Sequence, residues 1–243
     1  MYTVLCAAPL GLPAGSSLSA PPMADRVAST LYARGFAVLD RPQLDLAALA
    51  LLRGRTSSRL DDLLSEIRVA GVDPIEQHYT FGEIAHRQRL RWDLRLPATD
   101  EAWVSACEAA VAAATPVLER LHPACEIRTL MSGVLISRDG AEAQSWHADA
   151  DTTHFERARE AMHCRIYNAF MPLVDVARDG DGTEFWEGTH GTPCPSTPSE
   201  MDPPPGAAEA PACPAGGLVL ADYRTLHRGR ANQGRERQWP TSC

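Results

Sequence analysis

Hydrophobic residues in the first half of the chain recur mostly with the period of a helix. Residues 24–35, ADRVASTLYARG, have helical spacing and end on a glycine, and the short apolar run 36–40, FAVLD, follows as a strand. Residues 44–70 repeat apolar positions every three or four residues, which predicts one or two helices interrupted near Gly54. Residues 99–123 predict a further helix, with a kink or a break at the proline within it.

A different pattern separates these helices. The stretch RLRWDLRLP, residues 89–97, alternates between two kinds of side chain, which is the period of a strand. Its apolar positions are Leu90, Trp92, Leu94 and Leu96, and its charged positions are Arg89, Arg91, Asp93 and Arg95. We therefore expect a strand with one apolar and one cationic face. The cationic face either lies in water or lines a cavity, where Arg91 or Arg95 would meet an anionic group of a ligand.

Strand patterns dominate after residue 126. The expected segments are a hairpin over 128–149 with its turn at Asp139-Gly140, and strands over 164–176, 183–190 and 216–227. Residues 191–215 contain eight of the 19 prolines and predict a long irregular loop. Helices followed by short strands predict an α+β fold with a mainly β core: a sandwich or open barrel buttressed by the N-terminal helices.

Length, charge and cysteine content narrow the class of protein. The chain has 243 residues, a formal net charge of −8 and no lysine, which argues against a nucleic-acid binder with its clustered cations. No apolar run is long enough for a membrane span, and seven scattered cysteines without a CxxC pair fit reduced thiols inside a cell. We expect a disordered leader over 1–22, with a targeting segment as the alternative, and a single cytoplasmic domain over 23–243.

The segment QSWHADADTT, residues 144–153, concentrates residues that bind metals. His147 and Asp149 are two positions apart, so their side chains point to one face of an extended backbone. An imidazole and a carboxylate on one face are two of the three ligands in the 2-His-1-carboxylate site of non-haem iron enzymes. An HxD pair alone is also common in solvated turns, so the hypothesis needs a second histidine.

Three other histidines are candidates for that third ligand. His227 ends the predicted strand 216–227 and suits a ligand that faces the HxD pair across a sheet. Taken alone, it would be interpreted as a buried core histidine. His154 opens a short helical pattern over 154–162, and His190 lies on a turn, where a structural role is more typical. His227 is therefore the preferred ligand.

Three protein ligands leave positions on iron for a 2-oxoacid and for O2. The far carboxylate of 2-oxoglutarate also needs a cation, and arginine binds carboxylates through two hydrogen bonds. Four arginines lie in HRGRANQGRERQWP, which begins at His227. A turn and a return strand would bring a residue about ten positions later back to the interior. This favours Arg237 and leaves Arg235 as the alternative.

The motifs QSWHAD, GTEFWEGTH and GGLVLADYRTLHRGRANQGRER resemble, in this order, the phytanoyl-CoA-hydroxylase-like family of Fe(II)/2-oxoglutarate dioxygenases. The resemblance covers roughly residues 125–238. It implies a double-stranded β-helix, or jelly roll, of the cupin-like kind. It also implies that His147, Asp149 and His227 bind Fe(II) and that Arg237 binds 2-oxoglutarate.

The same resemblance suggests further residues around the cosubstrate. Gln144 and Tyr167 are cosubstrate-binding candidates, and a basic residue near the cosubstrate would fall about where Arg91 and Arg95 lie. The implied reaction is hydroxylation of a small organic substrate, which consumes O2 and 2-oxoglutarate and yields succinate and CO2.

Two departures from the family pattern leave other interpretations open. Gly229 stands where the family often has a hydroxyl residue, and the chain stops six residues after Arg237 instead of continuing through a full strand. One alternative is a catalytically silent jelly-roll protein that binds a metabolite or a partner, with a truncated last strand. Another is a cupin-type metalloenzyme without 2-oxoglutarate. Succinate release from 2-oxoglutarate would separate the oxygenase from both.

Overall fold

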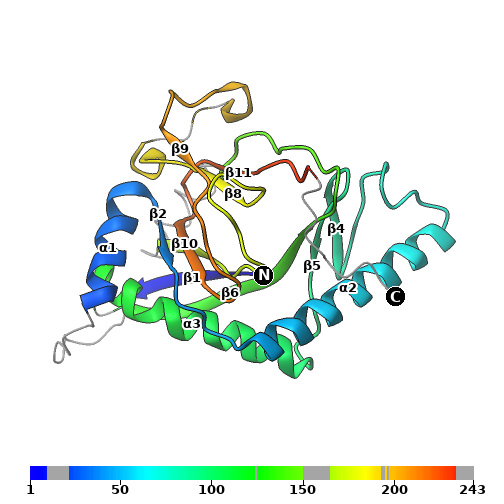
Figure 1. Ribbon diagram of the computed structural model, residues 1–243, viewed down its shortest axis with the longest axis horizontal. Coiled ribbons are helices and arrows are strands. Elements are labelled where there is room, and N and C mark those ends of the chain that lie inside the picture. Colours follow the sequence, from blue (N-terminus) through cyan, green and yellow to red (C-terminus); the bar gives the residue numbers. More distant parts are fainter. Residues whose placement is uncertain (10–21, 124, 150–164, 193–194, 196, 234–243) are drawn as a thin grey trace.

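Figure 1 shows the computed structural model of the chain. The structure describes residues 1–9, 22–123, 125–149, 165–192, 195 and 197–233. Its helices are α1 (Pro22–Arg34), α2 (Leu46–Val69) and α3 (Glu101–Leu121), with the short 3-10 helices η1 (Thr189–Gly191) and η2 (Pro198–Glu200). Of the helices in these ranges, none combines the length and the apolar character needed to cross a membrane.

The strands form two antiparallel sheets. The large sheet has the order β2 (Phe36–Leu39), β10 (Leu218–Asp222), β7 (Arg165–Phe170), β1 (Tyr2–Pro9), β6 (Cys125–Ser137), β5 (Arg91–Leu94), β4 (Ile84–Gln88) and β3 (Thr80–Phe81). The small sheet has the order β11 (His227–Gly229), β8 (Thr183–Trp186) and β9 (Ala208–Glu209). The prediction of a mixed fold with a mainly antiparallel β core is confirmed.

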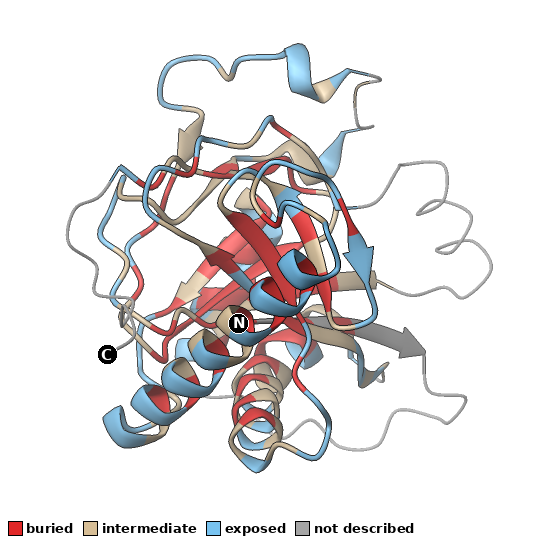
Figure 2. Ribbon diagram, turned by 90° about the vertical axis from the view of Figure 1, so that its right-hand side faces the viewer, coloured by how far each residue is buried: buried red, intermediate tan, exposed pale blue. Residues whose placement is uncertain are grey.

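Strand β10 shows how the large sheet serves two hydrophobic cores. All five of its residues are buried, and successive side chains point to opposite faces. Leu218 and Leu220 join the core beneath the helices, whereas Val219 and Ala221 pack with Phe185 of the small sheet. Buried residues accordingly concentrate in the sheets and on the inner sides of the helices (Figure 2). The sheet is therefore a shared wall between the helical layer and the space that holds the site.

An aspartate caps the start of each of the two longer helices, α2 and α3, and both helices are continuous. The side chain of Asp45 accepts a hydrogen bond from the backbone N–H of Ala48 at the start of α2, and Asp100 accepts one from Trp103 at the start of α3. The predicted interruption near Gly54 is wrong, since α2 is continuous there. Helix α3 likewise runs through its proline without ending.

The N-terminal segment departs from the prediction. Residues 1–22 were expected to form a disordered leader, but residues 2–9 form β1, which pairs with both β6 and β7 inside the large sheet. Leu5 is completely buried there. A strand in the interior of a covered sheet can be apolar along its whole length, so the absence of alternating polar residues is compatible with a strand here. Residues 10–21 lie outside the described residues.

The predicted hairpin over 128–149 is only half right. Its turn at Asp139-Gly140 is present, with the positive φ that favours glycine at the second position. The return segment does not pair with β6, which is already flanked by β1 and β5. It crosses instead to the small sheet. The Pro-rich segment 191–215 is less irregular than expected, because η2 and β9 lie within it.

Strand β5 confirms the alternating pattern but not a solvated charged face. Trp92 and Leu94 pack into the helix-side core, and Arg91 and Asp93 on the other face are buried as well. Arg95, just beyond the strand, is exposed. The charged face of β5 therefore turns inward, toward the space between the two sheets.

Candidate metal centre and its cavity

The two predicted histidine ligands meet through their backbones. His147 and His227 form an isolated antiparallel bridge, in which each N–H donates to the other residue's carbonyl at 3.0 and 2.8 Å. Their ring centroids are 4.6 Å apart. Residues opposite each other in an antiparallel bridge put their side chains on the same face. The bridge thus brings two imidazoles from distant parts of the sequence to one point.

Hydrogen bonds orient both rings in the same way. The Nδ1 atom of His147 lies 2.9 Å from the carbonyl oxygen of Ser145, and Nδ1 of His227 lies 2.9 Å from that of Thr225. A carbonyl only accepts, so each Nδ1 carries the proton and each neutral ring keeps its lone pair on Nε2. This is the tautomer that metal-binding histidines adopt when the second nitrogen donates to a carbonyl.

Asp149 completes a group of three possible ligands. One ligand atom from each of His147, Asp149 and His227 can be chosen so that all lie within 4.8 Å of one another. Nε2 of His227 lies 3.5 Å from Oδ2 of Asp149. Two imidazole nitrogens and a carboxylate on one side of an ion suit non-haem iron. The residues present fit that metal.

The three groups shift each other's pKa values. Burial lowers the pKa of His147, and the neighbouring His227 lowers it further. Burial opposes the charge of His227, but the Asp149 carboxylate outweighs it and raises the pKa of His227. Loss of hydration alone would raise the pKa of Asp149, yet the charge of His227 and the hydrogen bonds that Asp149 accepts bring it down to about 2. Asp149 is therefore ionised and available as a ligand at neutral pH.

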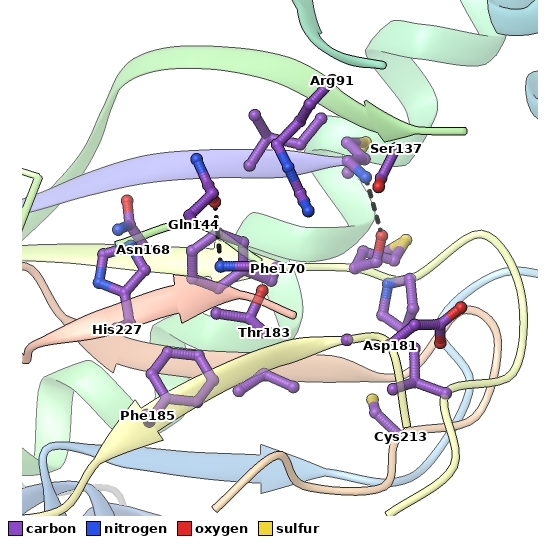
Figure 3. A pocket seen from close by; sticks show the side chains of 18 of the residues that line it. Arg91, Ser137, Gln144, Asn168, Phe170, Asp181, Thr183, Phe185, Cys213 and His227 are labelled. Atoms are coloured by element: carbon purple, nitrogen blue, oxygen red, sulfur yellow. Dashed lines mark hydrogen bonds between the residues drawn. The ribbon is translucent and has the colours of Figure 1, made fainter. Parts of the chain in front are cut away.

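A cavity of about 620 Å³ opens beside the triad (Figure 3). Its lining is polar near the triad and along β5, and elsewhere largely apolar, with Phe170 beside His227 and Phe185 below it in this view. The volume lies within the usual range for small-molecule sites. It is large enough for a dicarboxylate and part of a second small molecule.

Arg91 is the buried cation of this cavity. Its side chain is among the lining residues and the residue is 6% exposed. Its Nη2 atom donates hydrogen bonds to the carbonyls of Glu142 (3.0 Å) and Arg230 (2.9 Å), while Nε has no hydrogen-bond partner among the described residues. No acidic partner lies within ion-pair distance in the described part of the chain, and burial lowers the pKa of Arg91. A buried guanidinium without a counter-ion is energetically costly, so an anion bound beside Arg91 would be stabilising.

Gln144 and Tyr167, both predicted to bind the cosubstrate, have different positions. Gln144 lines the cavity, but its side-chain oxygen accepts from the backbone N–H of Gly229 at 2.9 Å. Tyr167 points to the opposite face of β7, where its hydroxyl lies 2.6 Å from Nε2 of His122. It is not among the residues that line the cavity. The structure therefore contradicts the cosubstrate role for Tyr167, because its side chain faces the helices.

The remaining candidates are quickly placed. Arg95 is exposed and is not among the described residues that line the cavity, so the structure does not bring it to the anion site with Arg91. His190 contacts the carbonyl of Tyr32 at 3.0 Å, which is a structural role. His154, Arg235 and Arg237 lie outside the described residues.

Several lining residues escaped the sequence reasoning. Asn168 donates a hydrogen bond from Nδ2 to Oδ2 of Asp149. Asp93 pairs with Arg87 at 2.6 Å, and Tyr223 lies close enough for the Asp149 charge to add to the burial that raises its pKa. The sequence YNAF does place Asn168 on the same face of a strand as Phe170, because alternate residues of a strand point to the same side. It does not show which of the two faces borders the cavity, because the strand is buried on both sides.

Two solved structures resemble the fold of this chain. The structure of AviO1 from Streptomyces viridochromogenes is 14% identical with a TM-score of 0.51, and the match covers 90% of this chain and 91% of that one. EvdMO1 is 15% identical with a TM-score of 0.50, covering 87% and 47% of the two chains. These likenesses concern the fold.

The solved structures that resemble this chain also include SnoN. SnoN, described as a non-haem α-ketoglutarate-dependent epimerase from nogalamycin biosynthesis, is 18% identical with a TM-score of 0.45, covering 89% of this chain and 80% of its own. Among curated proteins, none matches the chain. The family model for phytanoyl-CoA dioxygenase (PhyH) matches residues 47–238, which include the whole His-Asp-His triad. The chain therefore belongs to the phytanoyl-CoA dioxygenase family.

Proposed function

We propose that this protein is an Fe(II)- and 2-oxoglutarate-dependent hydroxylase of a small organic substrate. The observation that carries the proposal is the triad: His147 and His227, with Nδ1 held by backbone carbonyls, each present a Nε2 lone pair when neutral, and an ionised Asp149 lies beside them. Three ligands on one side leave the other side for cosubstrate and O2. Iron supplies the redox chemistry when bound; the chain supplies the ligands, the anion site and the substrate cavity.

The proposed reaction balances without another reductant. One molecule each of 2-oxoglutarate, O2 and substrate R–H would give succinate, CO2 and R–OH. Two electrons come from the oxidative decarboxylation of 2-oxoglutarate and two from the C–H bond. Asp149 argues for hydroxylation over halogenation, since related halogenases lack this carboxylate so that chloride can bind.

The architecture supports the proposal. We interpret the two antiparallel sheets as the two halves of a jelly roll, with the metal ligands at the edge where His147 meets β11. The cavity lies between residues of both sheets, as Phe170 of β7 and Phe185 of β8 indicate. A rigid barrel of this kind holds ligands from distant segments in fixed geometry.

We assign Arg91 to a carboxylate of 2-oxoglutarate. It is the buried guanidinium of the described lining that has no acidic partner there, and Nε still has a hydrogen to donate. A carboxylate received there would gain charge-assisted hydrogen bonds in a site that already excludes water. Arg237 remains the proposed second arginine, with Arg235 as the alternative; Arg237→Leu should raise KM for 2-oxoglutarate more than tenfold and Arg235→Leu should not.

The substrate is proposed to occupy the part of the cavity near Asp93 and Tyr223. Asp93, paired with Arg87, offers hydrogen-bond acceptors beside a donor, and Tyr223 offers a hydroxyl. Apolar residues such as Leu135 complete this wall. The combination favours a neutral molecule with an apolar body and a few polar groups.

The test is succinate formation by the isolated protein. Anaerobic protein is loaded with Fe(II) and 2-oxoglutarate, O2 is added, and succinate is measured with and without a metabolite extract. We expect slow succinate release alone and faster release with extract. His147→Ala, Asp149→Ala and His227→Ala should each abolish it, whereas His78→Ala, at an exposed histidine outside the cavity lining, should not. Absence of succinate from iron-loaded wild type would favour the catalytically silent alternative.

A further inference from the structure

Asn168 lies in the interior of the large sheet. It is in β7, opposite Val4 of β1 on one side and Ala221 of β10 on the other, and it is 2% exposed. Alternation along β7 turns Asn168 and Phe170 toward the cavity, while Tyr167 and Ala169 face the helices. Figure 3 shows the amide next to His227. A side chain with paired strands on both sides of its backbone has little freedom to move.

The amide of Asn168 contacts the carboxylate of the triad. Nδ2 of Asn168 donates to Oδ2 of Asp149, the same oxygen that lies 3.5 Å from Nε2 of His227. The direction of the bond is fixed, because an ionised carboxylate only accepts. Asp149 itself lies in a bend and has 30% of its side chain exposed, outside any strand. The sheet thus contacts, through Asn168, a carboxylate whose own backbone lies outside the strands.

The chemistry of an amide suits this position. A neutral donor orients the carboxylate and leaves its negative charge for a cation, whereas a guanidinium would form an ion pair that competes with the metal. A carboxylate oxygen has two lone pairs, so Oδ2 can accept from Asn168 and still bind a metal. The structure therefore offers a reason for asparagine here that goes beyond filling space.

We propose that Asn168 is a positioning residue for the metal centre: its amide fixes the carboxylate of Asp149 toward the two histidines before the metal binds. This inference rests on the proposed iron site. Removing hydrogen-bond partners of metal ligands typically weakens metal binding by about 10–100-fold. We expect a loss of that size for Fe(II) when the Asn168 donor is removed.

The test measures metal affinity directly. Anaerobic protein is titrated with Fe(II) against a competing chelator, and the visible absorption of the Co(II)-loaded protein reports the ligand arrangement. Asn168→Leu keeps the approximate shape and removes the donor. Asn168→Ser is the smaller replacement for the case that leucine prevents folding, and its shorter side chain should also fail to reach Oδ2. Both should bind Fe(II) about 10–100-fold more weakly and change the Co(II) spectrum.

The matched control is Asn232→Leu. Asn232 is also a buried asparagine of the cavity lining, but its Nδ2 donates to the carbonyl of Ser137 and not to the triad. It should retain Fe(II) affinity within about twofold despite a similar loss of melting temperature. Wild-type affinity and an unchanged Co(II) spectrum in either folded Asn168 variant would overturn the proposal, as would an equal loss in Asn232→Leu. A wild-type protein that binds no Fe(II) would instead reject the proposed function itself.

Discussion

Gly229 provides the space that the guanidinium of Arg91 occupies. A β-carbon at position 229 would lie 2.4 Å from Nη1 of Arg91 and 2.7 Å from Oε1 of Gln144. Where the family often has a hydroxyl residue, this chain has a glycine, and a buried cation from β5 fills the gap. The absence of a side chain at Gly229 is thus what allows the Arg91 guanidinium to take this position, and we expect substitutions at the two positions to have coupled effects.

Replacing Arg91 should weaken 2-oxoglutarate binding. Arg91→Gln removes the cation and keeps a polar side chain of similar length, so a buried carboxylate would lose its charged partner at a cost of about 2–5 kcal/mol. We expect KM for 2-oxoglutarate, measured by succinate formation, to rise at least tenfold while Fe(II) affinity stays near wild type. Arg95→Gln, at an exposed position, should change neither value. Equal effects of the two substitutions on KM would contradict the assignment of Arg91 to 2-oxoglutarate binding.

Filling the space at Gly229 should produce the same defect indirectly. Gly229→Ala puts a methyl group on the guanidinium, which must move. We expect a rise in KM for 2-oxoglutarate similar to that of Arg91→Gln. The double variant should be little worse than either single one, because residues that act as a unit are not additive. Gly54→Ala is the control, since no atom lies within 4 Å of the added carbon in mid-helix; it should raise stability by roughly 0.5–1 kcal/mol.

The outer face of the histidine bridge should contribute to stability. The Arg228 guanidinium lies 4.5 Å from the ring centroid of Trp146 and its Nε donates to Glu184 at 2.7 Å. Arg228→Leu removes both contacts, and we expect a loss of about 1–2 kcal/mol in the free energy of unfolding. The matched control is Arg89→Leu, which breaks the exposed pair with Glu76 and should cost less than about 1 kcal/mol. Urea unfolding of both variants measures the difference.

His122 makes the stability depend on pH. Burial lowers its pKa below the ordinary value of 6.5, and the charge of Arg165 acts in the same direction. Between the folded and the unfolded pKa the unfolded chain binds more protons, so this contribution is present above pH 6.5 and is lost as pH falls through 6.5 toward the folded pKa. The wild-type melting temperature should therefore fall more steeply from pH 8 to pH 5 than that of His122→Gln. Parallel curves for the two proteins would contradict this assignment.

Local patterns pointed to the three residues that the structure brings together as candidate metal ligands. The HxD spacing places His147 and Asp149 on one face, and the position of His227 within an apolar run pointed to a strand. These signals depend on residues close together in sequence. The backbone bridge between the two histidines is a long-range contact that was not predicted; only the approach of His227 to the HxD pair was inferred, because the chemistry requires a third ligand.

What the sequence left undetermined was which face of a fully buried strand serves which core. In β7 both faces are covered, so apolar periodicity cannot distinguish Tyr167, which faces the helices, from Asn168, which faces the cavity. In β5 the parity was clear, but the burial of Arg91 was not, since alternation alone is also typical of a half-exposed strand. Strand β1 was missed because its apolar residues precede a segment rich in glycine, proline and serine.

The backbone bridge between His147 and His227 fixes the distance between the two histidines independently of the length of the chain that connects them. Its two ends are eighty positions apart in the sequence, and the Pro-rich segment 191–215 lies between them. Doubling the length of a flexible connection changes the entropy of loop closure by only about 0.6 kcal/mol. Insertions or exchanges in the exposed parts of that connection would leave the spacing of the ligands intact. The metal site can therefore stay constant while the surrounding loops diverge to admit different substrates.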